Sequence, residues 1–290
     1  MKTLSLLIVA FFFCTMFVCC APNNLQHLHS KKPRATMIHL RGPVSPAWGT
    51  SLYNAFKDKK CSMIVAWIES GGGSVTEVKL LEHRIRTMRN EYPKSFMVYS
   101  ERILASGAYW LACLADSIVL SPAAYCGSIG VTYTRIDSTK LDAARGVVYH
   151  IFRSGQLKGL GNPHLPITAH EIHLASLRIS RIYREFIGVL MEKRGKRLAS
   201  AYDSLQTMVD YPMSFDDFIM TITDGDVFAG DDACAYGLAD KVLWFDQLLG
   251  FLKSNGYKVS TVRGMPVTKG AYMKACDSLM HHEIPVELIR

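Results

Sequence analysis

A buried strand, a glycine turn and a capped helix follow one another between residues 63 and 88, and this succession most constrains the fold. The strand is the apolar run MIVAWI at 63–68, which ends at Glu69 and precedes the glycine turn at 70–73. Continuous apolar runs of this length are typical of strands buried on both faces of a parallel sheet. Ser74 and Glu77 then form a capping box. It opens a helix with apolar residues at helical spacing, namely Val78, Leu81, Ile85 and Met88.

The same unit recurs along the chain. Residues 95–99 and 117–120 read as further strands, and a loop at Ser106 leads into a helix that runs through Leu114. This alternation predicts an α/β fold with parallel pairing and repeated strand–turn–helix units. The run VVYHIF at 147–152 predicts another strand.

Two longer helices are expected in the second half. Thr168 and Glu171 form a second capping box, and the apolar residues that follow lie on one helical face. They are Leu174, Leu177, Ile182, Phe186 and Leu190. Beyond Asp240, VLWFDQLLGFLKS reads as an amphipathic helix.

Composition is that of a folded protein. The chain has 290 residues, 49% hydrophobic and 20% charged, which is enough for one large or two small domains. Its net charge of +8 is scattered, with clusters at Arg84/Arg86/Arg89 and at 193–197. We expect these clusters on solvated helix faces and predict no nucleic-acid partner.

The first residues resemble an export signal. Met1-Lys2 precedes an apolar run from Leu4 to Val18 and a small-residue end at 19–21. We expect residues 1–21 to be a signal peptide or an N-terminal membrane anchor, with the protein exported to the cell membrane or its periplasmic side. Cleavage after Cys20, lipidation at Cys20 and retention as an anchor all stay open, although the run is shorter than the roughly 20 residues of a spanning helix.

Cysteines and histidines indicate no metal or cofactor. Cys61, Cys113, Cys126, Cys234 and Cys276 are widely spaced and lack any C-x-x-C pair, so we expect mostly core positions. The His170 to His173 stretch is one residue short of H-E-x-x-H.

Ser106 stands with Gly107 at the start of an apolar segment and is a candidate nucleophile. A serine hydroxyl needs a base to become a nucleophile. The G-x-S-x-G pattern of Ser/His/Asp enzymes is absent, because Leu104 and Ala108 occupy the positions two residues before and two residues after Ser106. A lysine base is the other solution, if a desolvated site lowers its pKa from about 10.4 towards 7 or 8. An adjacent carboxylate would defeat this. Lys158 meets the requirement in sequence, because residues 154–163 include no acidic residue.

Five stretches in order resemble the signal peptide peptidase A (SppA) family of Ser/Lys serine peptidases. They are SGGG at 70–73, LASGAYWLACLADSIVLSP at 104–122, GSIGV at 127–131, SGQLKG at 154–159 and DGDVFAGDDACAYGLADKV at 224–242. The resemblance implies a ClpP/crotonase-like α/β fold. It spans residues 36–246 as one peptidase domain, and residues 247–290 form a C-terminal helix and tail of unknown role.

The resemblance also assigns roles. It places Ser106 as nucleophile, Lys158 as general base, and the amides of Gly73 and Gly107 in the oxyanion hole. Ser128 is a candidate hydroxyl partner that orients the lysine, with a plain turn serine as the alternative. The chain departs from the family pattern at Gly71, where proline is usual, and at Asp226, where arginine is usual.

The resemblance implies hydrolysis of apolar peptides near a membrane, such as cleaved signal peptides, by a homo-oligomer. Two other functions stay open. A crotonase-like acyl-CoA enzyme would use the same glycine amides, and an inactive scaffold subunit of a membrane protease complex would need neither Ser106 nor Lys158.

Overall fold

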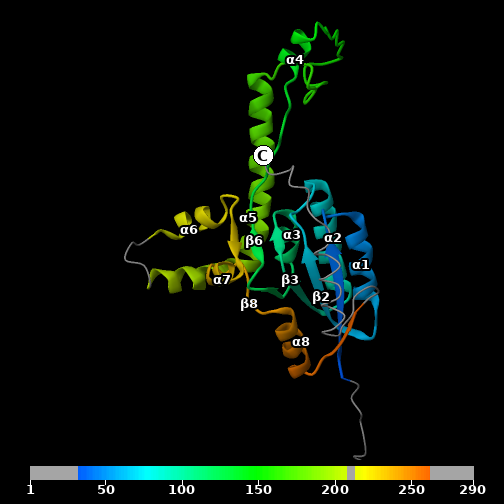
Figure 1. The fold of residues 1–290 in the computed structure, drawn as a ribbon, viewed down its shortest axis with the longest axis vertical. Coiled ribbons are helices and arrows are strands. Elements are labelled where there is room, and N and C mark those ends of the chain that lie inside the picture. The colour runs from blue at the N-terminus through cyan, green and yellow to red at the C-terminus, as the bar shows by residue number, and fades with distance from the viewer. Residues whose placement is uncertain (1–31, 208–212, 262–290) are drawn as a thin grey trace, which may run out of the picture. The chain divides into compact units, whose positions relative to one another are not determined.

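A six-stranded parallel sheet underlies the fold in this computed structural model, which describes residues 32–207 and 213–261 (Figure 1). The strand order is β8-β5-β3-β2-β1-β9. The strands are β1 Arg34–Arg41, β2 Cys61–Glu69, β3 Ser95–Ser100, β5 Ser117–Leu120, β8 Lys241–Val242 and β9 Lys258–Thr261. All neighbouring pairs in this sheet are parallel.

A small second sheet of three strands lies next to Ser106. It joins β4 Ile103–Ala105 in parallel to β6 Tyr125–Gly127, which pairs antiparallel with β7 Val227–Ala229. Three segments far apart in the sequence therefore meet at this point.

The described helices connect and cover these strands. They are α1 Pro46–Lys57, α2 Val75–Glu91, α3 Gly107–Ala112, α4 Thr139–Ala144, α5 Ala169–Gln206, α6 Phe215–Ile222, α7 Gly230–Ala235 and α8 Phe245–Ser254. The order of strands and helices confirms the predicted α/β class, with parallel strands linked by strand–turn–helix units. None of the helices that the structure describes is long and apolar enough to cross a bilayer.

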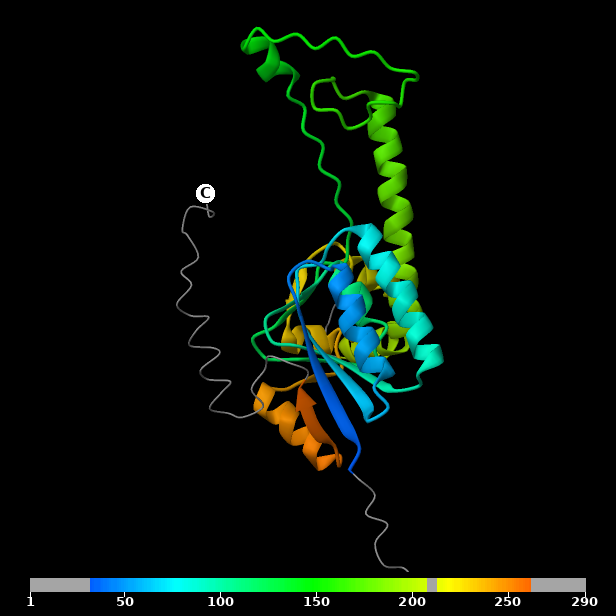
Figure 2. The ribbon, with the colours of Figure 1, turned by 90° about the vertical axis from the view of Figure 1, so that its right-hand side faces the viewer.

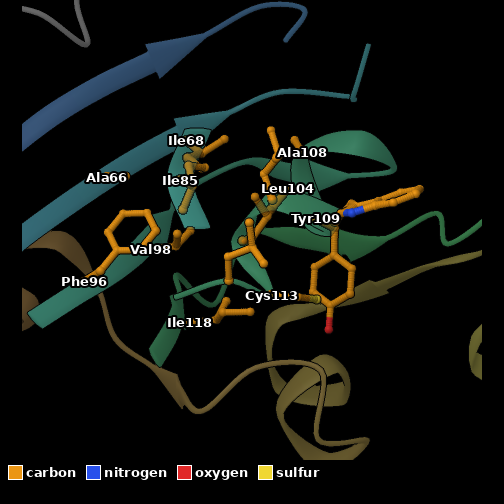
Figure 3. Packing of buried hydrophobic residues seen from close by; sticks show 14 of the residues in the cluster. Ala66, Ile68, Ile85, Phe96, Val98, Leu104, Ala108, Tyr109, Cys113 and Ile118 are labelled. Atoms are coloured by element: carbon orange, nitrogen blue, oxygen red, sulfur yellow. The ribbon is translucent and has the colours of Figure 1, made fainter. Parts of the chain in front are cut away.

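The strands are apolar on both sides because each face of the large sheet packs against helices. On β2, Ile64, Ala66 and Ile68 belong to the core beneath α1, α2 and α3. Figure 3 shows part of this core, where Phe96 and Val98 of β3 lie near Ile85 of α2.

The opposite sheet face packs on α8. There Val65 and Trp67 of β2 contact the cluster that includes Phe245 and Leu248. Figure 2 shows α8 beside β9, the strand that pairs with β1.

Both predicted helix starts are confirmed, each with the hydrogen bond that the N-cap side chain accepts. The Ser74 hydroxyl accepts a hydrogen bond from the Glu77 N–H at 3.3 Å, at the start of α2. The Thr168 hydroxyl accepts one from the Glu171 N–H at 3.1 Å, at the start of the 38-residue helix α5. The amphipathic helix after Asp240 is confirmed as α8, preceded by the short β8.

The strand predicted at 147–152 is wrong. These residues are irregular, and Val148 and Phe152 are 75% and 94% exposed. An apolar run forms a strand only where another strand supplies hydrogen-bond partners, and none of the described strands pairs with this segment.

Arg194 corrects the expectation that the basic cluster at 193–197 is solvated. Arg194 is only 1% exposed. Its guanidinium donates to the Gly237 carbonyl from Nε at 3.1 Å and Nη2 at 2.7 Å, and to Asp240 Oδ2 from Nη1 at 2.7 Å. Asp240 also accepts from Ile118 N–H at 2.7 Å and pairs with Arg197. Arg194 thus joins α5 to the segment between α7 and β8.

We expect Arg194→Ala to lower the free energy of unfolding by about 3–5 kcal/mol, because removing one partner leaves buried polar groups unpaired. Urea unfolding followed by circular dichroism measures the change. Lys196→Ala on the same helix, whose residue is exposed, is the matched control and should change stability by less than about 0.5 kcal/mol. Equal stability of the two variants would contradict this role for Arg194.

The predicted leader, residues 1–21, lies outside the described residues, as do residues 262–290 of the predicted tail and Cys276. Of the described cysteines, Cys61, Cys113 and Cys126 are buried, as expected of core residues, and Cys234 is half-buried.

Candidate active site

Ser106 lies at the N-cap of α3 with a strained backbone. Its φ of 52° and ψ of −127° are rare for a residue with a side chain. Two hydrogen bonds hold it there, from the Ser106 N–H to the Gly127 carbonyl at 2.8 Å and from the Trp110 N–H to the Ser106 carbonyl at 3.0 Å. Strain of this kind persists only where the surroundings impose it, and it gathers at functional sites.

The turn after β2 passes close to the Ser106 side chain. A Cβ on Gly72, whose φ is +114°, would lie 2.9 Å from Ser106 Cβ and 3.2 Å from Ser106 Oγ. The turn is held by Ser70, whose hydroxyl accepts from the Gly72 N–H at 3.1 Å, and by Val44, whose N–H donates to the Gly72 carbonyl at 2.9 Å. Glycine is therefore required at position 72 for the turn to reach the serine. Gly72 lies within the predicted glycine turn but was not among the residues predicted to form the site.

Gly73 and Gly107 meet beside Ser106. A Cβ on Gly107 would lie 3.5 Å from the Gly73 nitrogen and 2.5 Å from Val78 Cγ2. These two backbone amides are at the starts of α2 and α3, where N–H groups have no partner within their own helix. The structure therefore brings together three of the predicted site residues, Ser106, Gly73 and Gly107.

A pocket with both polar and apolar lining opens beside these residues. Its small and polar lining consists of Gly73, Ser106, Gly107, Gly130 and Thr132. Its apolar lining consists of Val75, Val78, Trp110, Val131, Ile182 and Phe186, from α2, α3, α5 and the segment after β6. Trp110 and Phe186 stack at 4.8 Å between ring centroids. The helical spacing of Val78 and Phe186 predicted burial, and only the packing of α2 against α5 shows that both border the serine.

Ser128 lies next to the site through its backbone. Ser128 has a positive φ of 48°, and its N–H donates to the Asp226 carbonyl at 2.6 Å. The carbonyl of the preceding Gly127 accepts the hydrogen bond from the Ser106 N–H. Ser128 itself is not among the residues that line the pocket.

Lys158 is not brought to Ser106 within one copy of the chain. It is exposed, its N–H donates to the Gly155 carbonyl at 3.0 Å, and it does not line the pocket. It belongs to the segment between β6 and α5, which in Figure 1 extends along α5 to α4. No lysine, histidine or carboxylate is among the described residues that line the pocket.

The buried thiols nearby are not alternative nucleophiles. Burial raises the pKa of Cys113 to about 12 and that of Cys126 well above its usual range. Both thiols are therefore neutral at working pH, and the thiolate is the reactive form. Among residues 32–207 and 213–261, no group of three or more histidine, cysteine or acidic side chains could hold a metal ion.

Comparison with known proteins agrees with the motifs. The family model "Peptidase family S49" matches residues 89–205. A Na(+)/H(+) antiporter NhaA of Brucella melitensis is 30% identical over 152 residues, which cover 52% of this chain and 21% of that protein. A putative signal peptide peptidase SppA of Enterococcus faecium is 24% identical over 208 residues, covering 70% of this chain and 54% of that protein. The chain thus spans about half the length, or less, of these relatives.

Among solved structures, a mutant of the 1510-N membrane-bound stomatin-specific protease in complex with a substrate peptide aligns with a TM-score of 0.47 at 11% identity. The alignment covers 86% of this chain and 99% of that chain. The family match includes the Ser106 segment and Lys158, and the SppA relative matches over most of the described residues. The chain is thus similar to peptidase family S49 over residues 89–205 and, at lower identity, to an SppA-type peptidase.

Proposed function

We propose that this chain is a serine peptidase in which Ser106 is the nucleophile and Lys158 the general base. The observation that carries the proposal is the strained Ser106 at the start of α3, with the amides of Gly73 and Gly107 beside it and a pocket that all three residues line. The similarity of residues 89–205 to peptidase family S49 supports the reaction class.

The reaction proceeds in two acyl-transfer steps. Ser106 Oγ attacks the peptide carbonyl carbon while neutral Lys158 Nζ takes the hydroxyl proton, and the carbonyl oxygen becomes an oxyanion. The intermediate collapses, the C–N bond breaks, and the lysine ammonium gives its proton to the leaving amine. Water then attacks the acyl-enzyme with the same lysine as base, which releases the acid and restores Ser106.

The oxyanion is stabilised by the N–H groups of Gly73 and Gly107. Two backbone donors at helix starts are already oriented before the reaction, so they need no reorganisation as charge develops. The absence of side chains at both positions lets the substrate carbonyl approach the backbone closely. Ser128 follows Gly127, the residue that holds Ser106, and from there its hydroxyl is proposed to orient the lysine without charging it.

Lys158 is proposed to reach Ser106 from a second copy of the chain. It is exposed on a segment with an unusual number of exposed apolar side chains, namely Tyr133, Ile136, Leu141, Val147, Val148, Tyr149, Phe152, Leu157 and Ile167. Soluble monomers rarely expose contiguous apolar patches, and larger ones mark interaction sites. Packing of this segment on a neighbouring copy would bury these residues and bring a base to a pocket that has none.

Apolar peptides, such as cleaved signal peptides, are the proposed substrates. The residues that line the pocket beside Ser106 include six with aliphatic or aromatic side chains, and none of the described lining residues is charged. A charged side chain entering it would lose its hydration without gaining a partner. We further propose that the protein acts after export, at the cell membrane or its periplasmic side, as the leader-like residues 1–21 suggest.

The test is cleavage of a peptide library by the purified full chain. We expect cleavage after small or medium apolar residues, and at least about 100-fold less after Asp, Glu, Lys or Arg, because burying an unpaired charge is costly. Ile182→Asp, which places a carboxylate in the pocket wall, should improve cleavage after Lys or Arg relative to Leu. The control Arg181→Ala changes an exposed neighbour outside this pocket. Preference for charged residues by the native chain would refute the substrate proposal. Binding of an acyl-CoA without any peptide cleavage would refute the peptidase itself.

A further inference from the structure

Arg135 and Glu171 form a buried ion pair within the segment that carries Lys158. Arg135 Nε donates to Glu171 Oε1 at 3.1 Å, and the two side chains are 5% and 10% exposed. Most other ion pairs of the described chain are more exposed. Burial is unexpected here, because the surrounding segment leaves many apolar residues in solvent.

The guanidinium of Arg135 binds the loop that follows Lys158. Its Nη2 donates to the Asn162 carbonyl at 2.9 Å and to the Leu165 carbonyl at 2.7 Å. Its Nη1 donates to the carbonyl of the adjacent Ile136 at 2.7 Å. One planar side chain therefore holds both ends of the loop 162–165 against Arg135's own segment, which follows β6.

The carboxylate of Glu171 also binds this part of the chain. Its Oε1 accepts from the Gly161 N–H at 2.9 Å, so the loop is held three residues after Lys158. The hydrogen bond from Gly161 and, after it, that from Arg135 hold the pKa of Glu171 below its usual range. The carboxylate is therefore charged at any pH at which a lysine base could work.

The loop itself is a series of tight turns that keep Lys158 close to these contacts. The N–H groups of Lys158, Leu160 and Asn162 donate to the carbonyls three residues earlier, at 3.0–3.1 Å. The loop makes a further contact with α4, where His164 Nδ1 is 2.8 Å from Asp142 Oδ2. Lys158 is thus exposed at its side chain but held firmly at its backbone.

A buried ion pair contributes little to stability, because desolvation of both charges offsets their attraction. Such pairs can instead specify one conformation when every polar atom is bonded. Arg135 bonds to Asn162 and Leu165, and Glu171 bonds to Gly161, so the two side chains together hold the loop after Lys158. We propose that Arg135 and Glu171 are positioning residues that hold the Lys158 loop in the conformation from which the lysine acts on Ser106. This inference rests on the proposed role of Lys158.

The test compares Arg135→Met, Arg135→Lys and Glu171→Gln with the matched control Glu185→Gln. Glu185 lies on the same helix in an exposed pair with Lys79 at 2.6 Å, far from the loop contacts in sequence. Kinetics use the full chain and a quenched fluorescent apolar peptide. Hydrogen exchange of the amides at 158–165 and in β2 reports loop order and fold separately.

We expect Arg135→Met to lower kcat about 10- to 100-fold with KM changed less than about twofold, since misplacing a catalytic group by about 1 Å can cost this much. Arg135→Lys keeps the charge but not the planar fork, so its loss should be nearly as large. Glu171→Gln should lose less, because the amide oxygen still accepts from Gly161. Exchange should quicken at 158–165 and stay unchanged in β2.

Three results would overturn the inference: a kcat equal to that of Glu185→Gln, a change confined to KM, or exchange that quickens equally in β2. Lys158→Ala in the same assay separates the two proposals. If Lys158→Ala is inactive and Arg135→Met behaves as the control, only the positioning role fails. If Lys158→Ala keeps full activity, the dyad fails and this inference with it.

Discussion

We expect Ser106→Ala and Lys158→Ala each to lower kcat for peptide hydrolysis by about 10⁴-fold or more, because removing the proposed nucleophile or its base disables a unit that works only as a whole. Lys158→Arg should be as inactive as Lys158→Ala, since guanidinium stays protonated and cannot accept the serine proton. Initial rates on an apolar peptide, with circular dichroism to confirm folding, measure both effects.

The matched control is Lys140→Ala. Lys140 is an exposed lysine of α4 in the same segment as Lys158, so the variant removes an equal charge from the same region. Its activity should stay within about twofold of the native chain, as is usual for surface substitutions. Full activity of Lys158→Arg would remove the lysine-base assignment. Full activity of Ser106→Ala would show that Ser106 is not the nucleophile.

We expect co-expression of Ser106→Ala and Lys158→Ala chains to restore activity that neither has alone. If Lys158 acts on the Ser106 of a neighbouring copy, some interfaces in a mixed assembly pair an intact serine with an intact lysine. Random assembly in equal amounts makes about one quarter of the sites complete, by the statistics of a repeated head-to-tail interface. The mixed assembly should therefore reach about one quarter of native kcat per chain.

Two differently tagged Ser106→Ala chains, co-expressed and purified in the same way, are the control and should remain inactive. A second variant tests the interface itself. Phe152→Asp places a charge on the most exposed of the apolar residues in the segment, and should dissociate the assembly and abolish activity without changing the sheet. Mixed chains that stay inactive while the single variants behave as expected would show that each chain completes its own dyad.

Local patterns determined the parts of the site that are built from short stretches of chain. The capping box at Ser74 and Glu77 set the start of α2, so Gly73 was expected at a helix N-terminus. The apolar run after Ser106 predicted the buried helix α3 with the serine at its mouth. These elements depend on hydrogen bonds between residues three or four positions apart, and such bonds can be read from the sequence.

Only the tertiary structure decided which distant residues meet. Gly72 approaches Ser106 because Ser70, in the turn after β2, forms a β-bridge with Leu104 of β4. Phe186 lines the pocket because α5 packs on α3, where Phe186 stacks on Trp110. The burial of Arg194 depends on the Gly237 carbonyl and Asp240, more than forty positions away. The run at 147–152 has the composition of a strand but no described partner, so it is not one.

The sequence by itself determined the α/β units, the helix that presents Ser106 and the glycine amides beside it. The tertiary structure decided that Lys158 lies on an exposed loop held by Arg135 and Glu171, away from the pocket lining of its own chain. The physical reason is that periodicity and capping act over a few residues, whereas the place of a side chain in space depends on pairing and packing between segments whose separation the sequence pattern does not encode.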